Sequence, residues 1–322
     1  MLTGWKKAGS AMINNLPLVS VIILNYNGKK YLDELLDKCI AAVLESDYVD
    51  IELIFVDNGS TDGSINHVRE RFGGDRRMKI VRLEKNYGTA KGKNEGIRNS
   101  RGAIIFLLNN DTLIPKNAIR RVVDALQIDK KVGIAGCKIV SPNGETQTEG
   151  VKFRKFLTIF EVLFENVFSD KTPSLYENLK GVKRVDWVWG TAIMIKKDVI
   201  EKIGLHDENY YAYSEEIDFC YRAKKSGFEV LSVTDVRIVH YGGVTSEHFP
   251  VWRTDLIWRN KLLFVLKHFS PIAVFIAFFI NFLDVLRLLA LGFLERDKYR
   301  LQVAKSKLKA YSYIKKEALS PK

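Results

Sequence analysis

The sequence predicts an α/β fold with a mostly parallel central sheet and helices on both faces. Between residues 18 and 136, short apolar runs typical of buried strands alternate with segments of helical period. The expected strands are Leu18–Leu24, Ile51–Val56, Lys79–Leu83, Ala103–Leu108 and Gly133–Cys137. With 322 residues, 47% of them hydrophobic, the chain is long enough for one large or two modest domains with a buried core. This composition excludes disorder over most of its length.

The segments between these strands carry helix signals. Apolar residues from 31 to 43 recur every three or four positions, and Ser60-Thr61-Asp62 is a capping cluster for a helix that ends near Phe72. Gly88, Gly92 and Gly96 share one face of a further helix, where either a ligand or the sheet comes close to the backbone. Later elements are expected at Arg184–Lys196 (strand), Asp198–Ile203 and Glu215–Lys225 (helices).

The net charge of +12 and the pI near 9.4 suggest nucleic acid as a partner. However, residues 295–322 contain nine Lys or Arg against three Asp or Glu, so half of the excess belongs to the last 28 residues. The remaining chain has no nucleic-acid recognition motif and no basic stripe. Nucleic acid is therefore not the expected partner.

Residues 269–294 are almost wholly apolar or aromatic. The uncharged part, Ser270–Leu283, is shorter than the roughly 20 residues of a spanning helix, and Asp284 and Arg287 are unfavourable at mid-membrane. We expect an interfacial or re-entrant helix pair rather than a clean span, with a buried core helix or a dimer face as alternatives. The basic segment that follows would be drawn to anionic headgroups.

The cysteines indicate a reducing compartment. Cys39, Cys137 and Cys220 lie far apart and form no C-x-x-C pair, so a zinc site, a redox motif or a disulfide scaffold is not expected. The first 25 residues have no apolar region followed by small residues, and a secretory signal is not expected either.

Carboxylates follow two of the predicted strands. Asp57 ends the run Ile54-Phe55-Val56, and Asp111 follows a second run together with Asn109 and Asn110. Ligands of parallel α/β sheets bind outside the carboxyl ends of the strands, and Mg²⁺ or Mn²⁺ takes oxygen ligands there together with substrate phosphates. An ordinary turn at Asp57 and a helix cap at Asp111 are the structural alternatives.

Two further segments carry chemistry. Glu215, Glu216 and Asp218 lie within four residues and are flanked by aromatic side chains, so repulsion and partial burial should raise the pKa of at least one carboxyl into the range of a general base. A strand that starts near Val236 ends in His240 before a glycine pair, a setting that suits a metal ligand.

In this order, the segments resemble family 2 glycosyltransferases with the Rossmann-like GT-A fold, particularly the rhamnosyltransferase-like branch. The resemblance covers about residues 18–265. It rests on Val19–Asn27, Val56–Asp62, Asn86–Gly96, Leu108–Asp111, Trp189–Ala192, Glu215–Arg222 and His240.

The resemblance implies a nucleotide-sugar pocket in which Asp57 binds the base. The implied pocket residues are Asn25, Asn27, Asp57, Asn86, Gly88, Lys91, Asn94, Asn110, Asp111 and Gly190. Asp111 matches the last acid of the family's D-x-D motif and would hold Mg²⁺ or Mn²⁺ together with His240. Asn109 stands where the first acid often lies, which removes charge from the site.

The resemblance also implies a catalytic base. Glu216 matches the catalytic base that deprotonates the acceptor hydroxyl with inversion at the anomeric carbon, although Glu215 and Asp218 remain rival candidates. Independently of the resemblance, Trp187 and Trp189, with the aromatic stretch Phe153–Phe168, are expected to face the acceptor, with core packing as the alternative for any one of these residues.

The sequence therefore predicts an inverting, metal-assisted hexosyl- or deoxyhexosyltransferase of cell-envelope polysaccharide biosynthesis. It would act on a lipid-linked or polysaccharide acceptor at the cytoplasmic face of the membrane. The expected organisation is an extension (1–17), a catalytic domain (18–265), a membrane-associating segment (266–294) and a basic tail (295–322). A nucleotidyltransferase that makes a nucleotide sugar is the alternative enzyme, although Asn25–Gly28 lacks its glycine-rich phosphate loop, and a basic nucleic-acid-binding protein is the non-enzymatic one.

Overall fold

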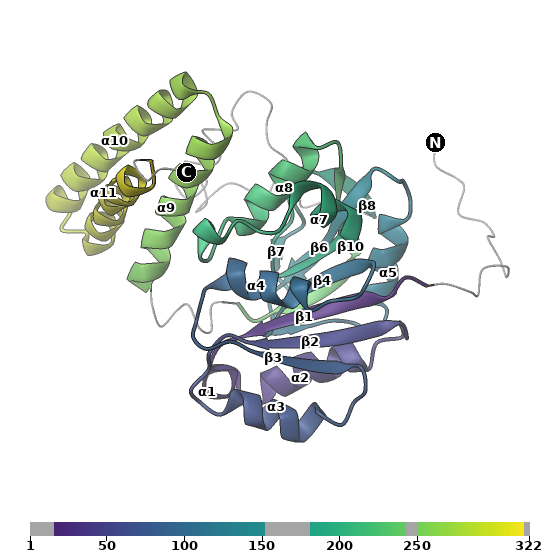
Figure 1. Cartoon of the computed structure of the whole chain (residues 1–322). Coiled ribbons are helices and arrows are strands. Elements are labelled where there is room, and N and C mark those ends of the chain that lie inside the picture. Colours follow the sequence, from purple (N-terminus) through teal and green to yellow (C-terminus); the bar gives the residue numbers. More distant parts are fainter. Residues whose placement is uncertain (1–15, 152–180, 243–249, 319–322) are drawn as a thin grey trace.

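A computed structural model describes residues 16–151, 181–242 and 250–318 of the chain. Its described strands form one sheet in the order β3-β2-β1-β4-β9-β6-β10-β5, with β7 on β6 and β8 on β10 (Figure 1). The first half consists of β1 (Val19–Asn25), β2 (Ile51–Asp57), β3 (Met78–Arg82) and β4 (Ile104–Asn109). These four strands pair in parallel, as predicted. All of β2 is buried, which explains why it reads as a continuous apolar run.

The second half of the sheet is mixed. Strand β9 (Ala192–Lys196) lies antiparallel between β4 and β6 (Val132–Val140), and β6 pairs in parallel with β10 (Glu229–His240). The short strands are β5 (Thr112–Leu113), β7 (Thr146–Thr148) and β8 (Val182–Val185). All three pair antiparallel with their neighbours. The α/β fold is confirmed, with antiparallel strands added to the predicted parallel set.

The single strand predicted over residues 184–196 is wrong. It is two strands, β8 and β9, and residues 186–191 between them leave the sheet. The backbone of Trp187 pairs with Val151 instead of continuing the β8 ladder. The break matters for function because this segment reaches the cleft described below.

Helices cover both faces of the sheet, as predicted. One core lies under α2 (Glu34–Leu44) and α5 (Ala118–Leu126), with α1 (Gly28–Leu32) and α3 (Ser64–Phe72) alongside. The other lies under α4 (Thr89–Arg98), α7 (Lys197–Ile203) and α8 (Glu215–Lys225), which follows a 3₁₀ turn at Glu208–Tyr210. In α4 a Cβ at Gly92 or Gly96 would come within 2.4 Å of Leu24 or Ile22, so these glycines let the helix pack on the sheet.

Three C-terminal helices form a separate layer beside the sheet (Figure 1): α9 (Pro250–His268), α10 (Pro271–Leu294) and α11 (Lys298–Ala318). Most of the predicted basic tail is thus a helix that packs on α9 and α10. The predicted helix pair within residues 269–294 is wrong, because Ser270 caps one uninterrupted helix and Pro271 occupies its first position. Within the described residues, α10 is the one helix long and apolar enough to cross a membrane.

Candidate active site

A cleft of about 800 Å³ opens at the carboxyl ends of the central strands. Ten residues predicted from the sequence line it: Asn86, Gly88, Asn110, Asp111, Trp187, Trp189, Gly190, Glu215, Glu216 and His240. Six others do not: Asn25, Asn27, Asp57, Lys91, Asn94 and Asp218. The fold therefore brings together strand ends that are more than 100 residues apart in the chain.

Asp57 and Asn25 lie directly beneath the cleft and are fully buried. The Asn25 side-chain amide donates to Asp57 Oδ2 at 3.3 Å and accepts from Asn110 at 3.0 Å, while Ser60 N donates to Asp57 Oδ1 at 3.0 Å. Asn27, in the left-handed conformation, accepts from Thr61 N. In this structure these side chains are engaged in shaping the turns at the ends of β1 and β2.

The turn around Asn86 depends on a residue that the sequence analysis did not single out. Asn58 donates to Asn86 Oδ1 at 3.0 Å and to the Gly88 carbonyl at 3.1 Å, and it accepts from Tyr87 N. Gly88 has φ +87°, and a Cβ there would meet the Tyr211 carbonyl at 2.4 Å. Asn58 follows Asp57 directly, so its place at a strand end was the available signal.

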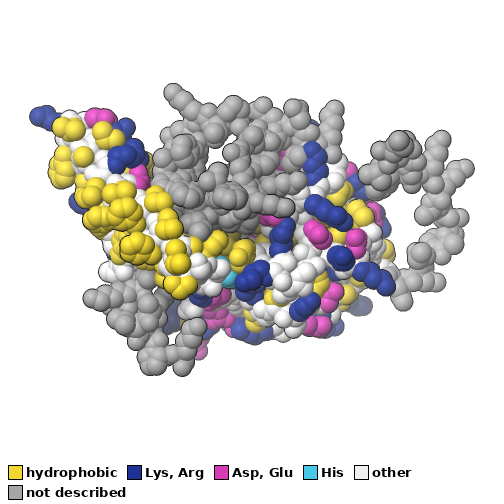
Figure 2. All heavy atoms as spheres, turned by 90° about the horizontal axis from the view of Figure 1, so that it is seen from above, with side chains coloured by type: hydrophobic (Ala, Val, Ile, Leu, Met, Phe, Trp, Pro, Cys, Tyr) yellow, Lys and Arg dark blue, Asp and Glu magenta, His cyan; other side chains and the backbone are white. Residues whose placement is uncertain are grey.

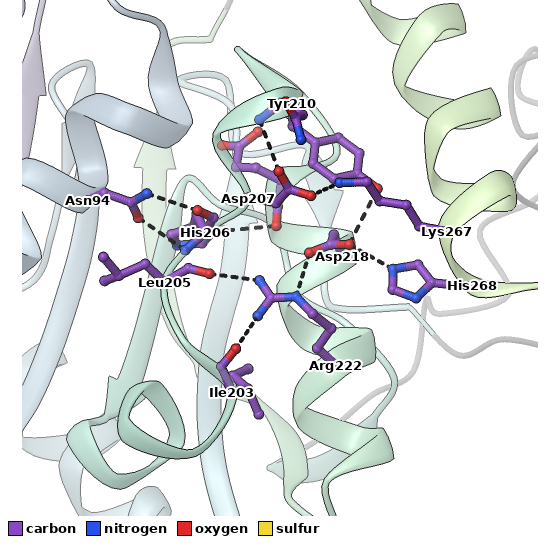
Figure 3. Close-up of polar contacts among 12 residues, drawn as sticks. Asn94, Ile203, Leu205, His206, Asp207, Tyr210, Asp218, Arg222, Lys267 and His268 are labelled. Carbon is purple, nitrogen blue, oxygen red and sulfur yellow. Dashed lines mark hydrogen bonds and ion pairs between the residues drawn. The ribbon is translucent and has the colours of Figure 1, made fainter. Parts of the chain in front are cut away.

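Of the predicted pocket residues that do not line the cleft, Lys91 and Asn94 lie on α4. The Lys91 ammonium is 4.5 Å from the centre of the Tyr87 ring. Asn94 is buried and exchanges two hydrogen bonds with the backbone of His206, at 2.9 and 3.0 Å (Figure 3). Asn94 thus connects α4 to the segment before α8.

Asp111 and His240 converge at one end of the cleft. Strand β5 pairs with β10, and Tyr241 N donates to the Asp111 carbonyl, which brings His240 Nε2 within 3.4 Å of Asp111 Oδ1. Asp111 Oδ1 is buried and has no hydrogen-bond partner among the described residues.

Gln147, on β7, fixes the His240 tautomer. Its amide nitrogen donates to the His240 carbonyl at 3.0 Å, so its oxygen, 2.9 Å from Nδ1, must accept the proton on that ring nitrogen. Nε2 of the same ring is then the nitrogen that faces Asp111 Oδ1. A carboxylate oxygen and an imidazole nitrogen that face each other in this way fit a transition-metal cation such as Mn²⁺, whereas Mg²⁺ would be held mainly by the oxygen. No set of three His, Cys, Asp or Glu that could hold a metal occurs in the part of the chain that the structure describes.

The three predicted acids have different surroundings. Glu215 is buried and pairs with Lys93, whose ammonium lies 3.0 Å from Glu215 Oε1 and 3.3 Å from the Gly190 carbonyl. Burial alone would raise the pKa of Glu215, but the Lys93 charge and further interactions outweigh it, so the pKa is below its usual value. Lys93 lines the cleft and was missed because it reads as an ordinary lysine of an amphipathic helix.

Asp218, on α8, is buried and is the centre of a polar network with Arg222 and His268 (Figure 3). Arg222 donates to Asp218 Oδ2 at 2.7 Å and to the carbonyls of Ile203 and Leu205, and His268 Nε2 lies 2.7 Å from Asp218 Oδ1. Burial alone would raise the pKa of Asp218, but the hydrogen bond from His268 and the Arg222 charge outweigh it, so this pKa is below its usual value. The raised pKa expected in the acid cluster is therefore wrong for Glu215 and Asp218, because each has a cationic partner.

Glu216 lies at the first turn of α8 and lines the cleft. A Cβ at Gly190 would stand 3.4 Å from its Cβ, so Glu216 faces the segment between β8 and β9. Tyr213 and Ser214 before it have positive φ values, 69° and 66°. Asn260 of α9 holds this turn by donating to the carbonyls of Ala212 and Tyr213, both at 2.7 Å.

Aromatic side chains form the rest of the wall. Trp187 and Trp189 line the cleft, and α9 adds Trp252, Arg253 and Lys261, none of which the sequence analysis had selected. The aromatic stretch Phe153–Phe168 lies outside the described residues.

Comparisons with known proteins agree with this architecture. The family described as Glycosyl transferase family 2 matches residues 20–204. The chain is 28% identical over 262 residues to the low-salt glycan biosynthesis hexosyltransferase Agl10 of Haloferax volcanii, which covers 80% of this chain and 77% of Agl10. It is 34% identical over 110 residues to the glycosyltransferase GlyG of Streptococcus pneumoniae, 34% of this chain and 35% of GlyG.

Solved structures show the same fold. The mannosyltransferase PcManGT from Pyrobaculum calidifontis, in complex with GDP-Man and Mn²⁺, superposes with a TM-score of 0.56 and 17% identity over 96% of this chain and 89% of that one. GalNAc-T7 with UDP, GalNAc and Mn²⁺ superposes with a TM-score of 0.52 and 16% sequence identity, over 70% of this chain and 43% of that one. At such identities the likeness concerns the fold alone, which is the GT-A fold. Since the family model matches more than half of this chain, the chain belongs to the family 2 glycosyltransferases.

Proposed function

We propose that the chain is an inverting, metal-assisted glycosyltransferase that moves a hexosyl or deoxyhexosyl group from a nucleotide-diphosphate sugar to an acceptor hydroxyl. The observation that carries this proposal is one cleft with two functional ends. Asp111 Oδ1 and His240 Nε2 face each other at one end, and Glu216 lines the same cleft beside Gly190.

Asp111 and His240 would hold a divalent cation, Mg²⁺ or Mn²⁺. When bound, such an ion stabilises the negative charge of the departing nucleoside diphosphate. Gln147 keeps His240 in the tautomer that a metal ligand needs. Because Asn109 is uncharged, the chain supplies one carboxylate, and phosphate oxygens of the donor would complete the coordination.

Glu216 is proposed as the general base. It would take the proton of the acceptor hydroxyl as the oxygen attacks the anomeric carbon, so that inversion results from a single displacement. Of its two rivals, Asp218 does not line the cleft and pairs with Arg222 and His268, and Glu215 forms a buried ion pair with Lys93. The side chain of Glu216 shares the cleft wall with Trp189, and the acceptor would enter beside it.

The donor is proposed to occupy the strand-end part of the cleft, between Asn86 and Asp111. Asp57, Asn25 and Asn27 would read the base after the buried side-chain contacts at the ends of β1 and β2 rearrange, or would shape that pocket from beneath. Lys91 and Asn94 would support the same region from α4. Trp187, Trp189 and the α9 residues would form the acceptor side.

The acceptor is proposed to be lipid-linked or a polysaccharide, in cell-envelope polysaccharide biosynthesis at the cytoplasmic face of the membrane. The role of the related Agl10 in glycan biosynthesis supports this proposal, and so does the apolar helix α10. We retain residues 18–265 as the catalytic part, 266–294 as the membrane-associating segment and 295–322 as the basic part.

A thermal-shift screen of nucleoside diphosphates and nucleotide sugars, with and without Mn²⁺, tests the proposal. We expect one nucleotide to raise the melting temperature only when Mn²⁺ is present, and its sugar conjugate to be consumed when acceptor is added. Release of pyrophosphate from a nucleoside triphosphate and a sugar phosphate would instead point to a nucleotidyltransferase.

A further inference from the structure

Helix α10 exposes large apolar side chains along its entire length. Ile272, Phe275 and Phe293 are each more than 70% exposed. The complete set of exposed large apolar residues on this helix is Ile272, Phe275, Ile276, Phe279, Phe282, Leu283, Leu286, Phe293 and Leu294. In Figure 2 the hydrophobic side chains cover the projecting helices, with Lys and Arg at their margins.

These residues form one stripe. At 3.6 residues per turn they fall within an arc of about 120° around the helix axis. The buried positions, among them Ala277, Asn281, Asp284 and Leu288, lie on the opposite side. One side of the helix is therefore exposed and the other is buried, and both sides are rich in apolar residues.

The buried side of α10 packs on α11 from Asn281 to Gly292. Lys307 pairs with Asp284 and lies 3.7 Å from the Trp258 ring centre, and Asn281 donates to the Tyr311 hydroxyl at 3.0 Å. Near the other end, Gly292 lets Leu301 approach, since a Cβ there would meet Leu301 Cδ2 at 2.7 Å. The two helices form one unit.

This pairing is unfavourable for a membrane span. A helix of 24 residues is long enough to cross, but Asp284 and Arg287 lie near its middle, and the Arg287 side chain is 50% exposed. Crossing would also carry α11 into the hydrocarbon region, with its exposed Lys305 and Lys309. The same charges have access to water when the helix lies flat.

We propose that α10 lies in the plane of one leaflet of an anionic membrane, with the stripe in the acyl region and α11 above it. This inference rests on the proposed function. It adds how the enzyme would be oriented on the membrane that carries its acceptor. Arg287 borders the stripe, and Arg296 and Lys298 follow its end, all exposed. In this orientation all three reach the phosphate level.

The charges also favour lipid over a second copy of the chain. A two-fold dimer that pairs the stripes in parallel would bring the same basic margin of each copy close to the other. Anionic headgroups neutralise that margin instead. A dimer is therefore a competing outcome of the test.

Depth-resolved labelling tests the orientation. Phe275→Cys, Phe282→Cys and Phe293→Cys variants of the full chain are labelled with an environment-sensitive dye and mixed with phosphatidylcholine–phosphatidylglycerol vesicles that contain brominated lipids. The three native cysteines are buried and should stay unlabelled. We expect similar, shallow quenching at all three positions, and none for Val49→Cys, an exposed position on the catalytic part. Deep quenching at residue 282 with shallow ends would show a span and overturn the proposal.

A binding series gives the second readout. Replacing Phe275, Phe279 and Phe282 together by Ser should weaken vesicle binding by about tenfold or more, whereas Ile128→Ser, at an exposed apolar site elsewhere, should leave it unchanged. A dimer in sedimentation without vesicles, or no vesicle binding by the native chain, would overturn the proposal. Donor titration without vesicles reports on the catalytic proposal separately, because no membrane is involved.

Discussion

The ammonium of Lys93 and the carboxylate of Glu215 lie 3.0 Å apart and are both buried, although 122 residues separate them in the chain. The same ammonium is 3.3 Å from the Gly190 carbonyl. This pair joins α4, the segment between β8 and β9, and the first turn of α8. It commits Glu215 to a structural role, while Glu216, the next residue, lines the cleft beside Gly190.

Removal of the Glu216 carboxylate should abolish transfer but spare donor binding. We expect Glu216→Gln to lower kcat by about 10²- to 10⁴-fold, the usual contribution of a general base. Nucleotide affinity, measured by titration, should change little. Asp218→Asn is the control, since it should lower stability while the folded fraction still turns over. An active Glu216→Gln with an inactive, folded Asp218→Asn would transfer the role to Asp218.

Loss of Lys93 should destabilise the fold. Lys93→Met leaves the buried Glu215 carboxylate without its cation, which costs about 3–5 kcal/mol for pairs of this kind. Urea unfolding of the single variants and of Lys93→Met/Glu215→Leu measures the coupling. The double variant should be more stable than Lys93→Met. Strict additivity of the two single changes would contradict the pairing.

His206 should make the folded state sensitive to moderate acid. Burial, with the nearby Lys93 charge, lowers the pKa of His206 to about 4, whereas an unfolded histidine titrates near 6.5. Between these values the unfolded chain binds a proton that the folded chain does not, so stability falls as pH decreases, by about 3 kcal/mol in total.

The His206→Phe variant isolates this effect, since a ring is retained against Phe219, whose centre lies 4.5 Å away. Its unfolding free energy should change less between pH 6.5 and pH 4 than that of the native chain. Equal slopes for the two proteins would show that His206 is protonated in the fold.

Asn260 should matter for both stability and turnover. Asn260→Ala removes two hydrogen bonds to the strained turn before α8, which costs about 1–3 kcal/mol and loosens the position of Glu216. We expect kcat to fall with little change in donor affinity. Asn281→Ala, in the contact of α10 with Tyr311, is the matched control and should lower stability without lowering kcat. Equal kcat values for both variants would remove Asn260 from the catalytic account.

Much of the fold and several site residues could be predicted from the sequence. The parallel strands are continuous apolar runs, and Asp111 and His240 each follow such a run, which places both at a strand end. Their contact then follows from the pairing of β5 with β10. Gln147 could not be predicted, because it lies on a three-residue strand with no period or motif.

The failures have physical causes as well. Lys93 looks like a solvated charge of an amphipathic helix, and Glu215 looks like a partly buried acid with no cation near it in the sequence, so only the folded chain pairs them. Asp284 reads as an interruption of the apolar segment, but Lys307, 23 residues later, compensates its charge and α10 continues. Both of these errors concern a charge whose partner is distant in the chain.

The central claim is that Asp111 and His240 form a divalent-cation site that binds the donor. Calorimetric titration of the identified nucleoside diphosphate into the native chain, with Mn²⁺ or with a chelator, tests it most directly, with Asp111→Asn and His240→Gln alongside. We predict Mn²⁺-dependent binding in the native chain and a loss of about tenfold or more in each variant, as is usual when a metal site loses a supporting group. Equal affinity with and without Mn²⁺, unchanged in both variants, would contradict the account.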